Sequence, residues 1–332
     1  MSVLSMFAGM ENGEGNGNHL KNVVLVDVSY FAHRVFHGYF KSGEKVNHVS
    51  MRYTLLWTIL NRFKNFNIKP STHEIIFCYD GQNYWKKVVA PYYKCRRADR
   101  RKDNKDWEGF RESMNSLQAE LEEYYPFMIL QFNKEVWYNE DDGQTYVSGI
   151  EADDVIGVLA KRFSNDENRN VIVMTGDGDF TQLDYLDNLT IINFEGKIMT
   201  AEHGCGAFDL LHKIVNGDSK DDISNILMRS DYWATKLDGE RQTSAKQLAK
   251  KCCDNFLNPT SVLTEEQKER FFENQRIQDF NFVPKDLQRA INNRYDNYVL
   301  NERSKIRDFL YDLKLNDGLI QDNLVDLLKE MV

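Results

Sequence analysis

Several features that define common protein classes are missing from this 332-residue sequence. No apolar run reaches the roughly 18 residues of a membrane-spanning helix, and no basic start followed by an apolar stretch suggests a secretory signal. The five cysteines are odd in number and include no CxxC pair, so neither a disulfide framework nor a zinc cage is supported. We therefore expect a protein of a reducing cytoplasm that is not associated with a membrane.

A net positive charge is also missing, because the chain carries 42 basic and 51 acidic residues and a formal charge of -9. That balance argues against a general nucleic-acid binder. The charge is uneven, however: the segment from Lys86 to Lys105 holds nine basic and two acidic residues and is +7, which leaves -16 for the rest. A basic stripe beside a strongly acidic remainder suits an anionic polymer held next to a cation-binding site.

Apolar periodicity divides the sequence into three parts. Residues 1–20 include a Gly- and Asn-rich stretch that predicts a flexible tail. In residues 21–200, short apolar runs alternate with helical patterns, which favours an α/β domain with a mostly parallel central sheet flanked by helices. Residues 201–332 show helical patterns only and predict a smaller all-helical C-terminal domain.

The expected elements can be assigned to ranges. Strands are predicted at Val23–Val28, Glu74–Tyr79, Phe127–Phe132, Val171–Met174 and Thr190–Phe194. Helices are predicted at Val49–Phe63, Trp107–Tyr125, Glu151–Phe163, Ala207–Val215, Ser244–Cys253, Thr264–Phe272, Pro284–Val299, Ser304–Leu313 and Asp322–Met331. Thr264 and Gln267 have the spacing of a capping box.

Acidic residues follow three of the expected strands. Asp27 closes the first, Asp80 follows the second, and a TGDGD stretch at 175–179 follows the fourth. Because an open parallel sheet binds ligands beyond the carboxyl ends of its strands, these residues are expected to meet in one crevice. Taken singly, each aspartate is more often an ordinary strand-end or turn residue, so the prediction rests on their conjunction.

Two further acidic groups accompany them. Glu151, Asp153 and Asp154 open an expected helix, where the helix dipole tolerates acids, but three acids in four residues exceed what a helix start requires. Asp218 and Asp221 are three residues apart and would share a face of a helical turn.

Clustered carboxylates repel one another and need a counter-ion. Mg²⁺ takes oxygen ligands, and two ions about 4 Å apart are the usual arrangement for in-line attack on a phosphodiester. No histidine or cysteine cluster offers a softer metal site. We therefore predict two Mg²⁺ ions per active site, for which Mn²⁺ would substitute.

Read in order, the acidic motifs resemble those of the 5′-nuclease, or flap endonuclease, superfamily. The motif residues are DVSYFAHR at 27–34, YDG at 79–81, EADD at 151–154, TGDGD at 175–179 and GDSKD at 217–221. Trp85-Lys86 followed by YYKCRR at 92–97 resembles its YKxxR arch segment. Within the superfamily, GDGDFTQL at 176–183 and RSDYW at 229–233 leading to DGER at 238–241 are most similar to the ribonuclease H branch of T-even phages. The likeness runs from about residue 23 to at least residue 250.

The resemblance implies a 5′-nuclease/PIN-like fold and a metal-dependent 5′→3′ nuclease acting on RNA–DNA hybrids, duplex 5′ ends and 5′ flaps. It further implies removal of lagging-strand RNA primers in phage DNA replication, in the cytoplasm of the infected bacterial host. By position, Asp27, Asp80, Glu151, Asp153 and Asp177 would surround the first metal, and Asp179, Asp218 and Asp221 would hold the second. Asp154 would be shared or would support these ligands.

The same resemblance places an arch at about residues 84–107, over the active site. Lys94 and Arg97 would contact the scissile phosphate, and Lys86 would assist them. Tyr92, Tyr93 and Trp85 either stack unpaired bases or pack in the ordinary way. The remaining expected nucleic-acid contacts of the arch are Lys87 and Arg96.

The helical domain would contain the family's helix–three-turn–helix, which grips duplex backbone. LDGERQTS at 237–244 keeps only Gly239 of the usual glycines, so we expect no monovalent-cation site there. Arg241, Lys246 and Lys250 would contact phosphate directly instead. Residues 3–10 are a candidate peptide for a sliding clamp, the C-terminal domain is a candidate partner of single-strand-binding protein, and the chain is expected to be a monomer.

Three other interpretations compete with this one. A PIN-type ribonuclease shares the clustered aspartates but not the basic arch and the GDxxD motif of a helical second domain. A catalytically silent DNA-structure-binding protein would lack ligands, whereas every acidic motif here is filled. The nuclease part of a DNA polymerase would need a much longer chain.

Overall fold

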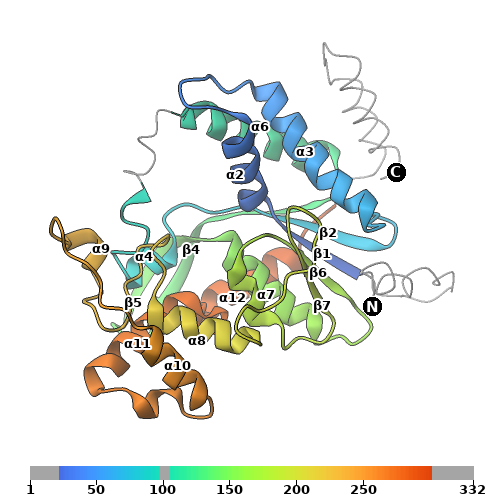
Figure 1. Ribbon diagram of the computed structural model, residues 1–332. Coiled ribbons are helices and arrows are strands. Elements are labelled where there is room, and N and C mark those ends of the chain that lie inside the picture. The colour runs from blue at the N-terminus through green and yellow to red at the C-terminus, as the bar shows by residue number, and fades with distance from the viewer. Residues whose placement is uncertain (1–21, 98–104, 301–332) are drawn as a thin grey trace.

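The computed structural model describes residues 22–97 and 105–300 (Figure 1). The candidate clamp peptide at residues 3–10, the middle of the basic segment, and the two last expected helices, Ser304–Leu313 and Asp322–Met331, lie outside these ranges. Within the described ranges, no helix combines the length and the apolar character needed to cross a bilayer.

A five-stranded parallel sheet organises the first part of the chain. Its order is β3 (Met128–Leu130), β2 (His73–Cys78), β1 (Asn22–Asp27), β6 (Val171–Met174) and β7 (Leu189–Ile192). Every neighbouring pair is parallel. The predicted sheet is therefore confirmed, with β1 at its centre between the other two strands that carry acidic residues at their ends.

Helices cover both faces of this sheet (Figure 1). α2 (Val28–Tyr39), α3 (His48–Asn65) and α6 (Trp107–Tyr124) pack on one face. α7 (Ala152–Ser164) and α12 (Lys285–Asp296) pack on the other. Because both faces are buried, β1 is apolar at each position from Val23 to Val26 rather than at alternate ones.

The burial of β1 follows this two-sided packing. Val24 and Val26 belong to the core under α2, α3 and α6, whereas Val23 and Leu25 belong to the core under α7 and α12. All four side chains are fully buried. The strand is therefore held from both sides, which fixes the position of Asp27 at its end.

The helical region has a core of its own. The region consists of α8 (Gly206–Asn216), α9 (Tyr232–Thr235), α10 (Lys246–Asp254), η3 (Pro259–Val262) and α11 (Glu265–Gln278). Leu211, Ile214, Ala249 and Phe271 pack together there. The predicted capping box opens α11, since the side chains of Thr264 and Gln267 each bond the other's backbone N–H.

The chain then returns from the helical region to the sheet. Phe280, in the short helix η4 (Phe280–Phe282), and Leu287 and Ile291 of α12 are buried in the same core as α7. The final described helix therefore packs as part of the α/β layer structure, although its sequence belongs to the run of helical patterns after residue 200.

One pair of strands was not expected from the sequence. β4 (Phe132–Asn139) and β5 (Gln144–Ile150) form an antiparallel hairpin next to β3. Trp137 is buried on its inner side, while Val136 and Val147 are paired and exposed on its outer side. The alternation of polar and apolar residues that marks a half-exposed strand is present in β4, but it follows the apolar run of β3 without a break.

Burial of His73 at the start of β2 makes a testable difference to acid stability. Its Nδ1 is 2.8 Å from Thr72 Oγ1, and its buried Nε2 has no hydrogen-bond partner among the described residues. Burial lowers the pKa of His73 to about 4. An unfolded chain takes up this proton near pH 6.5, so folding stability should fall as the pH falls from about 6.5 to about 4.

We expect this one group to cost about 2–3 kcal/mol of unfolding free energy between neutral pH and about pH 4.5. Urea unfolding of the wild type and of His73→Asn at both pH values measures the difference. The variant should lose less stability on acidification. An equal loss of stability in both proteins would mean that His73 takes up its proton at the same pH in the folded and the unfolded chain.

Candidate active site

Three adjacent strands deliver carboxylates to one edge of the sheet. Asp27 ends β1 and caps α2, accepting hydrogen bonds from Tyr30 N at 2.9 Å and from Thr175 Oγ1 at 2.8 Å. Asp80 follows β2, and its Oδ1 accepts from Ala152 N at 3.0 Å. Asp177 follows β6. The expected convergence at the carboxyl ends of the strands is therefore present.

The turn after β6 lies close to the Tyr30 side chain of α2. Asp177 caps the short helix η2 (Gly178–Leu183) through a 3.0 Å bond from Asp179 N. Before it, a Cβ on Gly176 would lie 2.0 Å from the Tyr30 hydroxyl oxygen. A larger residue would meet the Tyr30 ring of α2, so the glycine of the motif leaves room for that side chain.

The start of α7 adds two more carboxylates. Glu151 occupies the N-cap position, yet its side chain caps no backbone group of the helix. Instead, Glu151 Oε1 is 2.5 Å from Lys94 Nζ and Oε2 is 2.8 Å from Tyr93 OH. The Glu151 side chain therefore bonds Lys94 and Tyr93 instead of capping the helix.

The GDSKD loop follows α8. Gly217 adopts a φ of 70°, and a Cβ there would lie 2.4 Å from Ile223 O, so the turn accepts glycine alone without a shift of the backbone. Asp218 and Ile223 pair across the loop as an isolated β-bridge. Asp221 receives a 3.2 Å hydrogen bond from Tyr93 OH, which brings the loop to the side of Glu151.

Mutual repulsion is visible in the acidities of the cluster. Burial, together with the charges of Asp80 and Asp177, raises the pKa of Asp27 to about 7. Burial and the charges of Asp27, Asp177, Glu151 and Asp80 raise the pKa of Asp153 well above its ordinary value. The structure therefore brings together all five carboxylates expected around the first metal.

Lys94 lies inside the cluster rather than on an open arch. It is 6% exposed, lies 2.5 Å from Glu151 and 3.6 Å from Asp221, and has a positive φ of 52°. Burial opposes its charge, but these two carboxylates hold its pKa above the ordinary value. Arg97 stands near them, since the charges of Asp80, Glu151 and Asp221 help to raise its pKa against the effect of burial.

Three arch residues that were candidates for contact with nucleic acid are buried in this structure. Lys86 is 6% exposed and its Nζ lies 2.9 Å from Asp154 and 3.1 Å from Glu151. Trp85 is fully buried and donates a 2.7 Å hydrogen bond to Asp154, so it offers no face to a base. Tyr93 is 3% exposed and donates to Glu151.

These contacts leave Asp154 with both oxygens engaged, Oδ1 by Lys86 and Oδ2 by Trp85. Asp154 therefore holds the Lys86 and Trp85 side chains in place beside the cluster. The sequence does not indicate that Lys86 and Trp85 are buried, because a basic–aromatic stretch is typical of an exposed nucleic-acid contact.

Arg96, an expected nucleic-acid contact, is also engaged within the protein. Its Nε is 2.7 Å from Oδ1 of the fully buried Asp222, and its guanidinium lies 4.1 Å from the ring centre of Trp233. Tyr92 is half-buried and packs beside Ile223 and Ile277. Arg96 and Tyr92 therefore attach the base of the arch to the helical region, while Lys87 remains exposed.

Lys213 is a residue of the site that the sequence did not predict. From the last turn of α8, its Nζ contacts Asp179 and lies 3.1 Å from Asp218 Oδ2. A lysine at the end of a helix normally indicates no more than a favourable interaction with the helix dipole. Only the fold brings it between two distant acidic motifs.

The acidic side chains of the cluster are the possible ligands for a metal ion. Residues 22–97 and 105–300 hold no group of three His, Cys, Asp or Glu side chains already drawn together as a ligand set. Lysines instead lie against Glu151, Asp179 and Asp218. Burial and the charges of neighbouring carboxylates raise the pKa of Asp27 and Asp153, and a divalent cation beside them would lower it. All donors are carboxylate oxygens, so the set fits a hard cation such as Mg²⁺.

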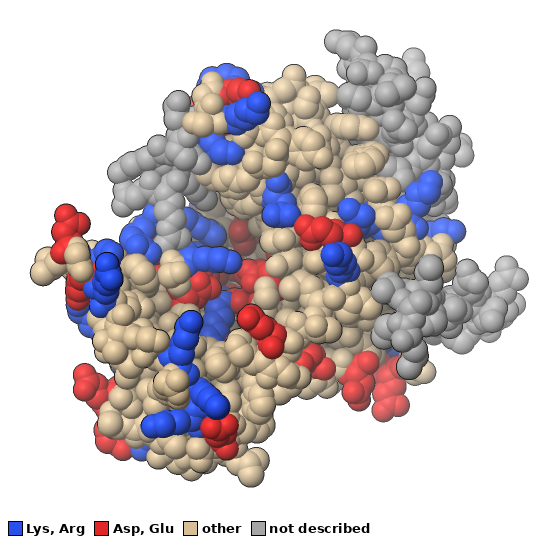
Figure 2. Space-filling view, viewed as in Figure 1, with Lys and Arg blue, Asp and Glu red and all other residues tan. Residues whose placement is uncertain are grey.

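Figure 2 shows these charges as a surface feature: acidic side chains gather in a hollow of the molecule, and Lys and Arg side chains lie along its border. The predicted phosphate contacts Arg241, Lys246 and Lys250 are all exposed in the helical region. Directly before Arg241, Glu240 accepts hydrogen bonds from Arg229 at 2.6 and 3.0 Å and from Leu237 N at 2.9 Å. The ion pair between Arg229 and Glu240 therefore stabilises the loop at residues 237–245, which precedes α10.

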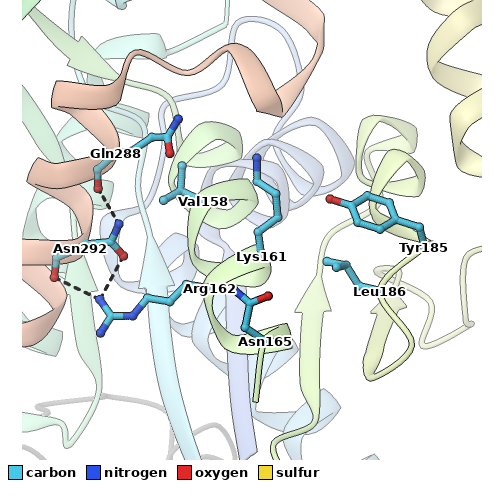
Figure 3. A pocket seen from close by; sticks show the side chains of 8 residues that line it. All are labelled: Val158, Lys161, Arg162, Asn165, Tyr185, Leu186, Gln288 and Asn292. Atoms are coloured by element: carbon cyan, nitrogen blue, oxygen red, sulfur yellow. Dashed lines mark hydrogen bonds between the residues drawn. The ribbon is translucent and has the colours of Figure 1, made fainter. Parts of the chain in front are cut away.

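A pocket of about 400 Å³ lies elsewhere, between the carboxyl-terminal half of α7, α12 and the chain after η2 (Figure 3). Its basic side chains already have partners: Lys161 donates to Phe280 O, and Arg162 donates to Asn292. Because the acidic residues stand at the opposite, amino-terminal end of α7, the pocket is separate from the carboxylate cluster.

A parallel sheet that delivers carboxylates from three neighbouring strands to one basic-bordered hollow has the architecture of a 5′ nuclease. The comparisons agree. The model of the 5′–3′ exonuclease N-terminal resolvase-like domain matches residues 22–208, and that of the T4 RNase H C-terminal domain matches residues 204–324. The chain belongs to this 5′–3′ exonuclease family and is a nuclease.

Individual relatives support the same assignment. The chain is 32% identical over 301 residues to the ribonuclease H of Enterobacteria phage T4, covering 88% of this chain and 92% of that protein. A phage T5 protein crystallised with metal ions shares the fold with a TM-score of 0.50 and 13% identity, over 94% of this chain and all of the other. The T5 flap endonuclease in a complex with DNA and metal ions gives a TM-score of 0.52 and 14% identity, over 93% of this chain and all of the other.

Proposed function

We propose that this chain is a divalent-metal-dependent 5′→3′ nuclease that cleaves RNA–DNA hybrids, 5′ ends of duplex DNA and 5′ flaps. The observation that carries the proposal is the meeting of acidic residues from β1, β2, β6, α7 and the GDSKD loop beside buried cationic side chains. Its test is the metal-dependent release of short products from a labelled 5′ end.

Two Mg²⁺ ions are the proposed cofactors, and Mn²⁺ is expected to substitute for them. Asp27, Asp80, Glu151, Asp153 and Asp177 would hold the first ion, and Asp179, Asp218 and Asp221 the second. Bound there, divalent cations neutralise phosphate charge and make a water molecule more acidic. We assign Asp154 to the support of Lys86 rather than to either ion, because both of its oxygens are engaged.

The chain's own residues would position and stabilise the phosphodiester. Lys94 is the strongest candidate, because its ammonium lies against Glu151 and Asp221, one carboxylate from each proposed ion site. From there it would donate to a phosphate oxygen on which negative charge develops. Arg97, whose NH1 lies 3.4 Å from Tyr84 OH at the same edge, would hold a second oxygen.

Branched or 5′-ended nucleic acid is the proposed substrate class, recognised by shape. The proposal is supported by exposed basic side chains, which suit backbone phosphates rather than base edges and so do not depend on base sequence. They are Lys87, Arg241, Lys246 and Lys250. Primer removal during phage replication, binding of a clamp by residues 3–10, binding of single-strand-binding protein by the C-terminal domain, and action as a monomer remain predictions.

The duplex grip can be tested apart from the chemistry. Replacing Arg241, Lys246 and Lys250 together with alanine should weaken duplex binding about 10- to 100-fold and reduce the slope of log affinity against log salt by about 3. Fluorescence anisotropy over a salt series measures both. Turnover at saturating substrate should change little, because none of the three lies at the carboxylate cluster.

A matched variant carries three alanines at exposed lysines of other regions, Lys69, Lys134 and Lys285. Lys69 precedes β2, at the opposite end of the sheet from the acidic edge. This variant should keep its affinity within about twofold. An equal loss of affinity in both triple variants would show that net charge, rather than the loop at residues 237–245 and α10, determines duplex binding.

Two candidate functions of other classes remain distinguishable. A catalytically silent protein would bind branched DNA without cleaving it in any divalent metal. A PIN-type ribonuclease would cleave single-stranded RNA and would show no preference for a 5′ end paired to DNA. The 5′–3′ exonuclease family membership favours the nuclease over the first, and the match of the helical region to the T4 RNase H C-terminal domain favours it over the second.

A further inference from the structure

Lys213 is a cation that the proposed cleavage step does not require, and it lies between two carboxylates of the site. Its Nζ contacts Asp179 Oδ1 and is 3.1 Å from Asp218 Oδ2. The three side chains are 19%, 22% and 20% exposed, respectively. Partial burial reduces screening by water and salt, so both ion pairs are stronger than ordinary surface pairs.

The ammonium also connects two parts of the chain that are far apart in sequence. Asp179 belongs to η2 and Asp218 begins the loop after α8. The backbone of that loop already satisfies the other oxygen of Asp218, since Lys220 N donates to Oδ1 at 2.7 Å. The oxygen that remains on Asp218 faces Lys213, and the same ammonium reaches Asp179.

The first ion site differs in this respect. Among the described residues, no lysine or arginine forms an ion pair with Asp153 or Asp177, whereas Lys213 forms one with each of Asp179 and Asp218. Glu151 of the first set is paired with Lys94 and Lys86. A divalent cation entering between Asp153 and Asp177 therefore meets carboxylates without a lysine or arginine ion pair among the described residues. A cation entering between Asp179 and Asp218 meets a positive charge already there.

We propose that Lys213 is a tethered counter-ion that competes with the second divalent cation for Asp179 and Asp218. The inference rests on the proposed function, which assigns both carboxylates to that cation. An ammonium has three donors and no acceptor, so it and a divalent cation cannot use the same oxygen lone pairs. The second cation therefore binds weakly until Lys213 leaves, and the first binds without this competition.

Binding of Mn²⁺ to the full chain, without nucleic acid, tests this directly. Electron paramagnetic resonance of free Mn²⁺ should give a tight and a weak site for the wild type. Lys213→Gln should tighten the weak site by about tenfold or more, the effect of removing a partly buried charge–charge contact, and should leave the tight site unchanged within about twofold. Lys213→Arg keeps the charge and should keep the weak affinity.

Lys220 provides a matched control, because its charge also lies close to Asp218. Lys220→Gln should change the weak affinity by less than about threefold, since the Lys220 side chain is exposed and water and salt screen its charge. An equal tightening in the Lys220 and Lys213 variants would reduce the effect to net charge and contradict the proposal. So would a weak site in Lys213→Gln that is unchanged or weaker.

The possible failures are distinguishable. If the wild type binds no Mn²⁺ at either site, the metal-dependent function itself is wrong. If it binds two ions and Lys213→Gln leaves both affinities unchanged, only the competition is wrong. The Arg variant gives an independent measurement should Lys213→Gln not fold: a second site tightened about tenfold there would equally overturn the inference.

Discussion

Asp153→Asn should lower the cleavage rate by about a thousandfold or more, because it removes a carboxylate from the centre of the proposed first ion site. The charges of four other acids help to raise the pKa of Asp153, which shows that it faces them. Binding of a 5′-flap duplex should be retained, since the duplex contacts lie in the helical region. Single-turnover cleavage and anisotropy measure the two quantities separately.

The same substitution should not weaken the fold. Removing one charge from a set of mutually repelling carboxylates relieves repulsion, so the melting temperature in chelator should equal or exceed that of the wild type. Asp187→Asn, at an exposed position after η2, is the matched control and should leave cleavage unchanged. Retained turnover in Asp153→Asn would remove the basis of the metal assignment.

Lys94→Ala should lower kcat about 100- to 1,000-fold while KM changes by less than about threefold, as for loss of an interaction made mainly in the transition state. Its buried position against Glu151 and Asp221 supports this expectation. Glu151 keeps its contacts with Lys86 and Tyr93, so the loss of one ammonium leaves that carboxylate supported.

Lys87→Ala distinguishes chemistry from attraction. Lys87 is exposed and lies over the Tyr84 ring, outside the carboxylate cluster. Its replacement should affect KM more than kcat. If Lys94→Ala lowered kcat and affinity equally, Lys94 would be a binding residue, and the developing charge would need another partner.

The sequence predicted the sheet and its acidic edge well, for a physical reason. Strands buried on both faces are continuously apolar, and residues directly after such strands must emerge at the carboxyl edge. Asp27, Asp80 and Asp177 could therefore be placed together before any coordinates were known. The capping box of Thr264 is equally local and was confirmed.

The partners of those carboxylates could not be predicted in the same way. Lys86, Trp85 and Tyr93 belong to a basic–aromatic stretch that is typical of exposed nucleic-acid contacts, yet tertiary packing places all three against Glu151 or Asp154. Lys213 is brought to Asp179 by the packing of α8 against η2, across 34 residues of sequence. Such long-range ion pairs leave no periodic signal in the chain.

The most direct test is cleavage of a 5′-labelled RNA–DNA hybrid and a 5′-labelled flap duplex by the full chain, with Mg²⁺ and with EDTA. The account predicts short labelled products from the 5′ side in Mg²⁺ and none in EDTA. Structure-selective binding without cleavage in either condition would contradict it. The carboxylate cluster would then belong to a binding protein and would require a different explanation.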